Sequence, residues 1–148
     1  MSFEFVFFNN KIYAVSNLNN PLPKTIGKNK EGVLILCTAF TNPTLQAFLA
    51  KILQAVNTDI SEDVWVMDVN DVEIPKWADL CRELDFKKAI IFGLDAKAMG
   101  LLINLPLYQC RQFQGCQILL ADALVDINND NHKKKELWRE LQQLFSNT

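Results

Sequence analysis

The sequence predicts an α/β fold: a three-layer α/β/α sandwich around a mostly parallel central sheet of four to five strands, with an N-terminal β-hairpin. The first observation behind this prediction is a series of short, continuous apolar runs, which are typical of strands covered on both faces. The second is that amphipathic helical patterns separate the runs, which favours parallel strands joined by helices. The runs lie at 33–37, 64–67 and 89–92, and a fourth run after Gly115 ends at Ala121.

The chain begins with two short β-prone runs, Phe3 to Phe8 and Lys11 to Val15. The pair Asn9-Asn10 stands between them. Because asparagine tolerates positive φ, this pair predicts the two-residue turn of a β-hairpin.

A change of composition then suggests where the main body begins. Residues 16–32 contain two prolines, two glycines and several Asn and Lys residues, which is typical of a loop or tether. We therefore predict an N-terminal hairpin and tether over residues 1–32 and an α/β domain over residues 33–148. A chain of 148 residues has the length of one domain.

Two helices are expected between the first three buried strands. Asn42 is a suitable helix cap and Pro43 suits the first helical position, so the first helix should continue from there to Val56. Pro75 predicts the start of the second helix. The apolar face of that helix should consist of Ile74, Trp77, Leu80, Cys81 and Leu84.

The last third of the chain alternates short elements with irregular backbone. We predict a short helix from Asp95 to Leu101, irregular structure over 102–109, and a short strand over 110–113. The strand ending at Ala121 leads into a polar turn over 126–131. A C-terminal helix should follow, with an apolar face made of Leu137, Trp138, Leu141, Leu144 and Phe145.

Charge and cysteine content argue against several function classes. The net charge is −2, so there is no basic surplus for strong direct binding of nucleic acid. Cys37, Cys81, Cys110 and Cys116 form no CxxC pair, and with a single histidine the sequence has no zinc-ligand spacing, so a zinc site is not expected. We expect reduced core thiols, no metal or cofactor, and a cytoplasmic location. No basic leader or membrane-spanning apolar stretch is recognisable, so neither secretion nor membrane insertion is expected.

Of the polar residues expected at the carboxyl ends of the strands, where ligands bind in open α/β sheets, four are predicted to line a possible degenerate ligand pocket. They are Thr38, Asn42, Asp95 and Asp122. One interpretation is a ligand pocket with paired carboxylates, and the other is a set of helix caps and solvated loop residues. We predict no catalytic residue, because His132 stands in a polar cap beside three lysines, as a surface residue would.

The closing unit of the chain resembles that of the psi subunit family of bacterial DNA polymerase III. In that family an apolar strand is followed by a small-residue turn with a leucine, an Asn-centred cap, and a helix with the pattern Lys-x-x-Leu-Trp-x-x-Leu. The corresponding parts of this chain are residues 118–124, the cap at 128–131, and a helix containing Lys134 or Lys135, Leu137-Trp138 and Leu141. The similarity covers roughly residues 33–145.

This resemblance implies a fold similar to that of the uracil-DNA glycosylases without their chemistry. The turn at 93–96 lacks the tyrosine-histidine ending of the water-activating motif, and the turn at 121–124 lacks the histidine that stabilises the departing base. A glycosylase must hold a flipped base and stabilise charge, and the residues for this are not recognisable.

The resemblance also implies a bridging function. Psi-like proteins bind the clamp loader through an N-terminal segment and bind a small partner, chi, through the body. Tyr13 stands where the family carries clamp-loader-binding residues, and the predicted hairpin carries apolar groups on both faces. One face of the hairpin could cover the body and the other could meet a partner. The predicted partner-binding residues are Phe5, Phe7, Ile12 and Tyr13.

Two other functions remain open from the sequence. One is a degenerate glycosylase-fold enzyme or nucleotide-binding protein that uses Asn42, Asp95 and Asp122. The other is an interaction module with a partner unrelated to replication.

Overall fold

The computed structural model describes residues 25–38, 40, 42–69 and 74–146, which form a mixed α/β fold. Its sheet has six strands in the order β1-β3-β2-β4-β6-β5. The strands are β1 (Thr25–Ile26), β2 (Val33–Cys37), β3 (Val64–Asp68), β4 (Lys88–Phe92), β5 (Arg111–Phe113) and β6 (Cys116–Ala121). The helices are α1 (Pro43–Gln54), α2 (Trp77–Glu83), α3 (Leu124–Asn128) and α4 (Asn131–Ser146).

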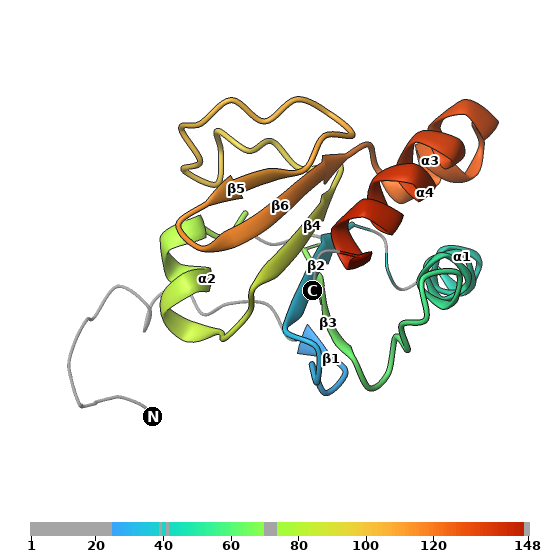
Figure 1. Cartoon of the computed structure of the whole chain (residues 1–148), viewed down its shortest axis with the longest axis horizontal. Coiled ribbons are helices and arrows are strands. Elements are labelled where there is room, and N and C mark those ends of the chain that lie inside the picture. The colour runs from blue at the N-terminus through green and yellow to red at the C-terminus, as the bar shows by residue number, and fades with distance from the viewer. Residues whose placement is uncertain (1–24, 39, 41, 70–73, 147–148) are drawn as a thin grey trace.

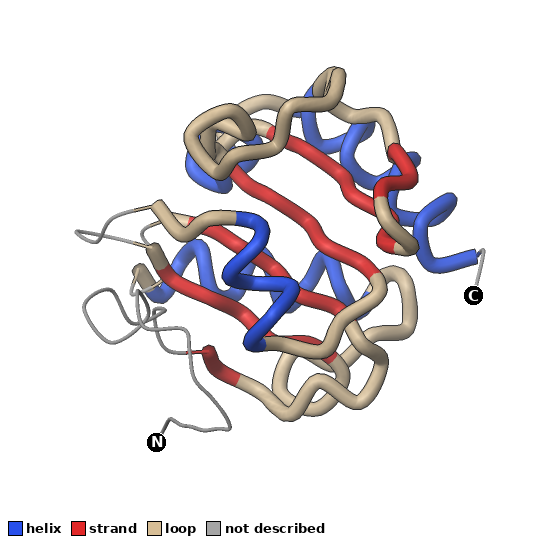
Figure 2. The backbone as a smooth tube through the Cα atoms, turned by 90° about the vertical axis from the view of Figure 1, so that its left-hand side faces the viewer, coloured by secondary structure: helices blue, strands red, loops and turns tan. Residues whose placement is uncertain are grey.

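The four inner strands run parallel, and the two edge strands run antiparallel to their neighbours. Figure 1 shows α1, α3 and α4 on one side of the sheet and α2 on the other, and Figure 2 shows α2 in front of the strands. Helices therefore cover both faces of the parallel part, as the continuous apolar strands require.

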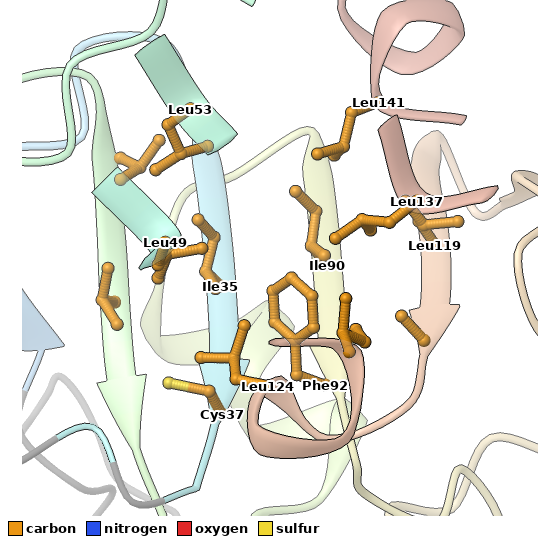
Figure 3. Close-up of a cluster of buried hydrophobic side chains, with 14 of the residues drawn as sticks. Ile35, Cys37, Leu49, Leu53, Ile90, Phe92, Leu119, Leu124, Leu137 and Leu141 are labelled. Atoms are coloured by element: carbon orange, nitrogen blue, oxygen red, sulfur yellow. The ribbon is translucent and has the colours of Figure 1, made fainter. Parts of the chain in front are cut away.

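Burial explains why the inner strands read as unbroken apolar runs. Every residue of β2 and of β4 is buried. On one face, Leu49 and Leu53 of α1 and Leu137 and Leu141 of α4 pack against the sheet (Figure 3). On the other face, Trp77 and Leu80 of α2 contribute to a second apolar cluster. Since alternate strand residues point to opposite faces, both sets are apolar, apart from the buried Lys88 at the start of β4.

The start of α1 confirms the prediction made from Asn42 and Pro43. Asn42 is the N-cap in an extended conformation, and its side chain accepts a hydrogen bond from the backbone N–H of Thr44. Pro43 occupies the first helical position, where its missing N–H costs nothing. Of the next residues, Leu45, Leu49 and Leu53 are buried at helical spacing.

The segment after β4 differs from the prediction. A short helix was expected from Asp95 to Leu101, but residues 96–100 form turns. Gly100 has φ +82°, a left-handed conformation that ends any helical run. The backbone N–H groups of Met99 and Leu101 both reach the carbonyl of Ala96, so the turns close locally. The irregular structure expected over 102–109 and the strand near 110–113 are confirmed.

Two side chains expected in the core lie at the surface. Cys81 was predicted on the apolar face of the second helix, but it is exposed. The helix begins at Trp77 and has only seven residues, so a narrow stripe containing Trp77 and Leu80 is sufficient to cover the sheet. Trp138 was predicted on the buried face of the C-terminal helix and is 48% exposed.

The sheet also has one strand more than the four to five expected. Thr25 and Ile26, which we assigned to the tether, pair with Met67 and Val66 of β3 as an antiparallel edge strand. The hairpin predicted over residues 3–15 and its partner-binding residues Phe5, Phe7, Ile12 and Tyr13 lie outside the described residues. Within the described ranges, no helix has the length and apolar character to span a membrane.

The C-terminal unit follows the predicted order of strand, turn and helix, with one addition. The turn contains a five-residue helix, α3, whose Leu124 and Ile127 are buried. Asp130 then caps α4, because its Oδ1 accepts hydrogen bonds from the backbone N–H groups of His132 and Lys133. Asx capping was the signal recognised in the sequence, and the structure assigns it to Asp130.

Candidate functional site

The carboxyl ends of the parallel strands meet at one edge of the sheet, the usual ligand site of open α/β folds. Thr38 follows β2 and Asp122 follows β6, while Asp95 lies just beyond β4. Because β4 pairs with both β2 and β6, these segments share that edge. Among the described residues, however, no hydrogen bond or ion pair joins any two of Thr38, Asn42, Asp95 and Asp122.

Asn42 and Asp95 are both used as caps. The Oδ1 atom of Asn42 lies 2.9 Å from the backbone nitrogen of Thr44, at the start of α1. The Oδ1 atom of Asp95 accepts a hydrogen bond of 3.0 Å from the backbone N–H of Lys97. Both hydrogen bonds lie in exposed surroundings. For these two residues, local backbone capping accounts for the polar side chain without any ligand.

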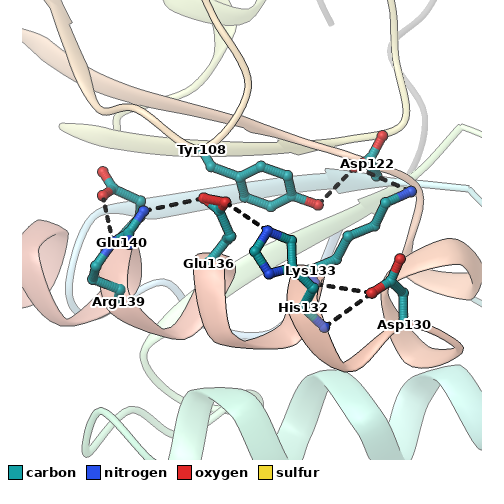
Figure 4. A network of polar contacts seen from close by, with 8 residues as sticks. All are labelled: Tyr108, Asp122, Asp130, His132, Lys133, Glu136, Arg139 and Glu140. Carbon is teal, nitrogen blue, oxygen red and sulfur yellow. Dashed lines mark hydrogen bonds and ion pairs between the residues drawn. The ribbon is translucent and has the colours of Figure 1, made fainter.

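Asp122 belongs to a polar network that joins three parts of the chain (Figure 4). The hydroxyl of Tyr108 donates a 2.8 Å hydrogen bond to Oδ2 of Asp122, and Nζ of Lys133 lies 3.6 Å from the same oxygen. Burial, followed by the hydrogen bond to Asp122, raises the pKa of Tyr108, so its phenol stays neutral and donating. The network therefore fastens the irregular segment and α4 to the end of β6.

Further along α4, the polar side chains pair with one another. Nε2 of His132 lies 3.2 Å from Glu136, and Arg139 lies 3.1 Å from the same carboxylate. The side chain of His132 is 81% exposed, which confirms its prediction as a surface residue. Such exposed pairs stabilise a helix only weakly, and they do not orient a base toward a nucleophile.

Between β4 and β6, the carboxyl edge is filled by close backbone packing. Gly93 has φ +71°, and a methyl group added to it would lie 2.7 Å from Cβ of Ala123. Its N–H donates to the carbonyl of Ala121, the last residue of β6, which extends the pairing of the two strands one residue beyond the end of β4. Leu124 then packs in the same cluster as Cys37 and Phe92, the last residues of β2 and β4 (Figure 3). Between β4 and β6, this part of the edge is therefore closely packed among the described residues.

The described residues offer no obvious alternative site for a metal ion. No group of three His, Cys, Asp or Glu residues in that part of the chain is arranged to hold one. Burial raises the pKa of the Cys37 thiol to about 12, with Asp68 adding to the shift. Cys37 is therefore a protonated core side chain, as the sequence predicted.

An apolar groove lies elsewhere, between α1 and α4. It has a volume of about 480 Å³. Its apolar lining consists of Ala47, Phe48, Ile52, Ala55, Leu137 and Trp138, and its polar lining consists of Thr44, Lys51, Asn128 and Lys134. Leu137 is buried at the base, Phe48 and Ile52 are partly buried, and Trp138 is half exposed. Half-exposed aromatic and aliphatic groups beside one another are typical of protein-binding surfaces.

The charged residues that line the groove are both cations. Lys134 places its ammonium 5.7 Å from the centre of the Phe48 ring. Neither Lys51 nor Lys134 forms an ion pair with another described residue. The groove therefore combines an apolar base with positive charge that the described part of the chain does not neutralise.

No protein-family model matches the chain, and no curated protein is significantly similar to it. The function must therefore be inferred from the site geometry and from the sequence resemblance described above.

Sequence reasoning missed both main features of these surfaces. Tyr108 lies in a segment without periodicity, so nothing local connects it with Asp122, which is 14 positions away. The groove residue Trp138 was assigned to the core because it falls at helical spacing with buried leucines. A usable signal was present: Trp138 stands at one edge of the apolar stripe from Leu137 to Phe145, where a neighbouring layer covers a helix least.

Proposed function

We propose that this protein is a non-enzymatic accessory subunit of the replication machinery, psi-like, which connects the clamp loader to a second partner through protein contacts. We take its architecture to be a three-layer α/β/α sandwich, with α1, α3 and α4 as one outer layer. In the second outer layer, α2 is joined by the irregular segment after β4. A cytoplasmic location and a role without a cofactor belong to the same proposal.

The groove between α1 and α4 is the observation that carries the protein-binding part of this proposal. Its lining leaves Trp138 48% exposed beside partly buried aliphatic and aromatic groups. A partner that covered this surface would remove apolar area from water, which is the main source of binding energy in protein interfaces. The body of the protein thus has a surface for the second partner.

The contacts of the polar residues at the carboxyl edge of the sheet support a binding function over a catalytic one. Asn42 and Asp95 cap backbone groups, and Asp122 is bonded to Tyr108 and Lys133. A nucleophile or base needs a free, oriented partner, and these groups are held in structural contacts instead. The identity of the machinery is carried by the resemblance of the closing unit to the psi family.

Affinity purification of the tagged full-length protein from its own cells tests the proposal. Clamp-loader subunits should be retained by the wild type and by Asp95→Ala, because that side chain only caps a turn. They should be lost with Tyr13→Ala, which alters a predicted partner-binding residue. Mass spectrometry of the eluates provides the measurement, and circular dichroism confirms that each variant is folded.

Two results would contradict the proposal. The first is the absence of clamp-loader subunits from the wild-type eluate when the purification is repeated at low salt, where electrostatic contacts are strongest. The second is loss of these subunits with Asp95→Ala while Tyr13→Ala retains them, which would move the functional site to the sheet edge.

A further inference from the structure

We infer that the groove between α1 and α4 binds an acidic amphipathic helix of a partner protein. The inference rests on the proposed function only in treating the groove as a protein-binding site, and it adds the chemical class and secondary structure of the occupant.

The shortage of polar lining groups argues for a helix. An extended peptide brings unpaired backbone N–H and C=O groups and needs partners for them. The lining of this groove has only four polar side chains, and it comes from α1, α4 and the last residue of α3, whose backbones are already bonded within helices. A helical occupant satisfies its own backbone and presents only side chains. A third helix laid between two others is also the ordinary geometry of helix packing.

Charge complementarity argues for an acidic occupant. Lys51 and Lys134 line the groove, while no carboxylate does so among the described residues. Carboxylates at the edges of an amphipathic helix would meet these ammonium groups at the rim of the interface. A basic helix would place like charges together, which costs affinity and slows association. The apolar face of the occupant would cover Trp138, Phe48 and Ile52.

The first turn of α4 carries positive charge beside the groove. This turn has no acidic residue and contains Lys133 and Lys134. Cations at a helix N-terminus oppose the macrodipole, although the carboxylate of Asp130 caps this helix and offsets part of that effect. Lys133 has an internal partner in Asp122, but Lys134 lies over Phe48 at the groove. An acidic ligand at this position would remove the unfavourable interaction.

The test uses two labelled synthetic peptides of about 18 residues, long enough for several helical turns. Both have leucines at i, i+3, i+4 and i+7, and glutamate fills the remaining positions in one peptide and lysine in the other. Fluorescence anisotropy with the full chain should show that the glutamate peptide binds at least about tenfold more tightly than the lysine peptide. Amide shift mapping should locate the bound glutamate peptide on α1 and α4.

Variants of the full chain separate the apolar contribution from the charged one. Trp138→Ala should weaken binding of the glutamate peptide about tenfold or more, as loss of an aromatic hot spot does. Leu102→Ala is its control, because Leu102 is 87% exposed and outside the groove. Lys51→Glu combined with Lys134→Glu should reverse the preference toward the lysine peptide. Lys135→Glu, on the same helix but not in the groove lining, should retain the original preference.

Three outcomes would overturn the inference. Equal affinity for the two peptides, or a preference that the double charge reversal does not change, would remove the acidic requirement. Amide shifts confined to other elements would place the binding elsewhere. A concentration-dependent dimer that Trp138→Ala abolishes would identify a second copy of this chain as the occupant. Nuclear Overhauser contacts between residues 1–24 and the groove would identify the N-terminal segment instead.

These failures are distinguishable from failure of the proposed function. Peptide binding is measured with the isolated chain, whereas the clamp-loader result comes from the purification with Tyr13→Ala. Retained clamp-loader subunits together with no peptide preference would overturn only the acidic-helix inference. If the chain prefers the glutamate peptide but the eluate contains no clamp-loader subunits, only the replication role would be overturned.

Discussion

Replacement of Gly93 by alanine tests whether the sheet edge between β4 and β6 is closed as the structure shows. Gly93 follows β4 with φ +71°, and its backbone approaches Ala123 closely. The added methyl group would lie 2.7 Å from Cβ and 2.8 Å from Cα of Ala123. Since one of these atoms belongs to the backbone, the neighbour cannot move aside by changing a rotamer.

The expected loss of stability has two parts. The left-handed conformation costs a residue with a Cβ atom about 1–2 kcal/mol. Forcing an extra methyl group into a packed site typically costs about 1–3 kcal/mol more. The free energy of unfolding should therefore fall by roughly 2–5 kcal/mol, a large share of the stability of a small domain.

Gly100→Ala is the matched control, because it has the conformational cost without the steric clash. Gly100 has φ +82°, and a methyl group there meets no atom within 4 Å. Urea unfolding followed by circular dichroism should show Gly93→Ala to be less stable than Gly100→Ala by about 1–3 kcal/mol. Adding Ala123→Gly to Gly93→Ala should recover part of the loss, because it removes the clash with the Ala123 side chain and leaves the clash with the backbone.

Equal stability of Gly93→Ala and Gly100→Ala would refute this reasoning. It would mean that the turn after β4 is not held against Ala123. The space near Asp95 and Asp122 would then be open to a ligand, and the enzymatic alternative would regain support.

Three further measurements test other parts of the structure. A thiol reagent added to the native protein should modify exposed Cys81 first and leave Cys37 unreacted until unfolding, and Cys81→Ser should abolish the fast reaction. Tyr108→Phe should lower the free energy of unfolding by about 1 kcal/mol through loss of the hydrogen bond to Asp122. The fold raises the pKa of Tyr108 above its ordinary value of 10.0, so the neutral phenol stabilises the folded state fully below pH 10.0 and this stabilisation is lost as the pH rises further. Urea unfolding at increasing pH should therefore show a smaller alkaline loss of stability in Tyr108→Phe than in the wild type. Asn42→Ala should cost about 1 kcal/mol by urea unfolding, whereas Asn42→Asp should retain the cap, and a loss of equal size in both variants would argue against capping.

The candidate site was predictable only in part. Sequence patterns located Thr38, Asn42, Asp95 and Asp122 near strand ends, because apolar runs end where polar residues begin. They left open whether these residues form a pocket or act as caps. That question depends on distances between residues far apart in the sequence, such as Tyr108 to Asp122 and Gly93 to Ala123.

The sequence by itself determined the α/β class, the buried parallel strands and the cap at Asn42. These features follow from local periodicity and from hydrogen bonds between near neighbours, which a linear pattern records. Tertiary structure alone decided the exposure of Trp138 and Cys81, the pairing of β1 with β3 and the turns after Asp95. Helical spacing shows that a side chain shares a face with buried leucines, but only the position of the neighbouring helix decides whether that side chain is covered. The groove between α1 and α4 lies where Leu137 is buried and its neighbour Trp138 is half exposed.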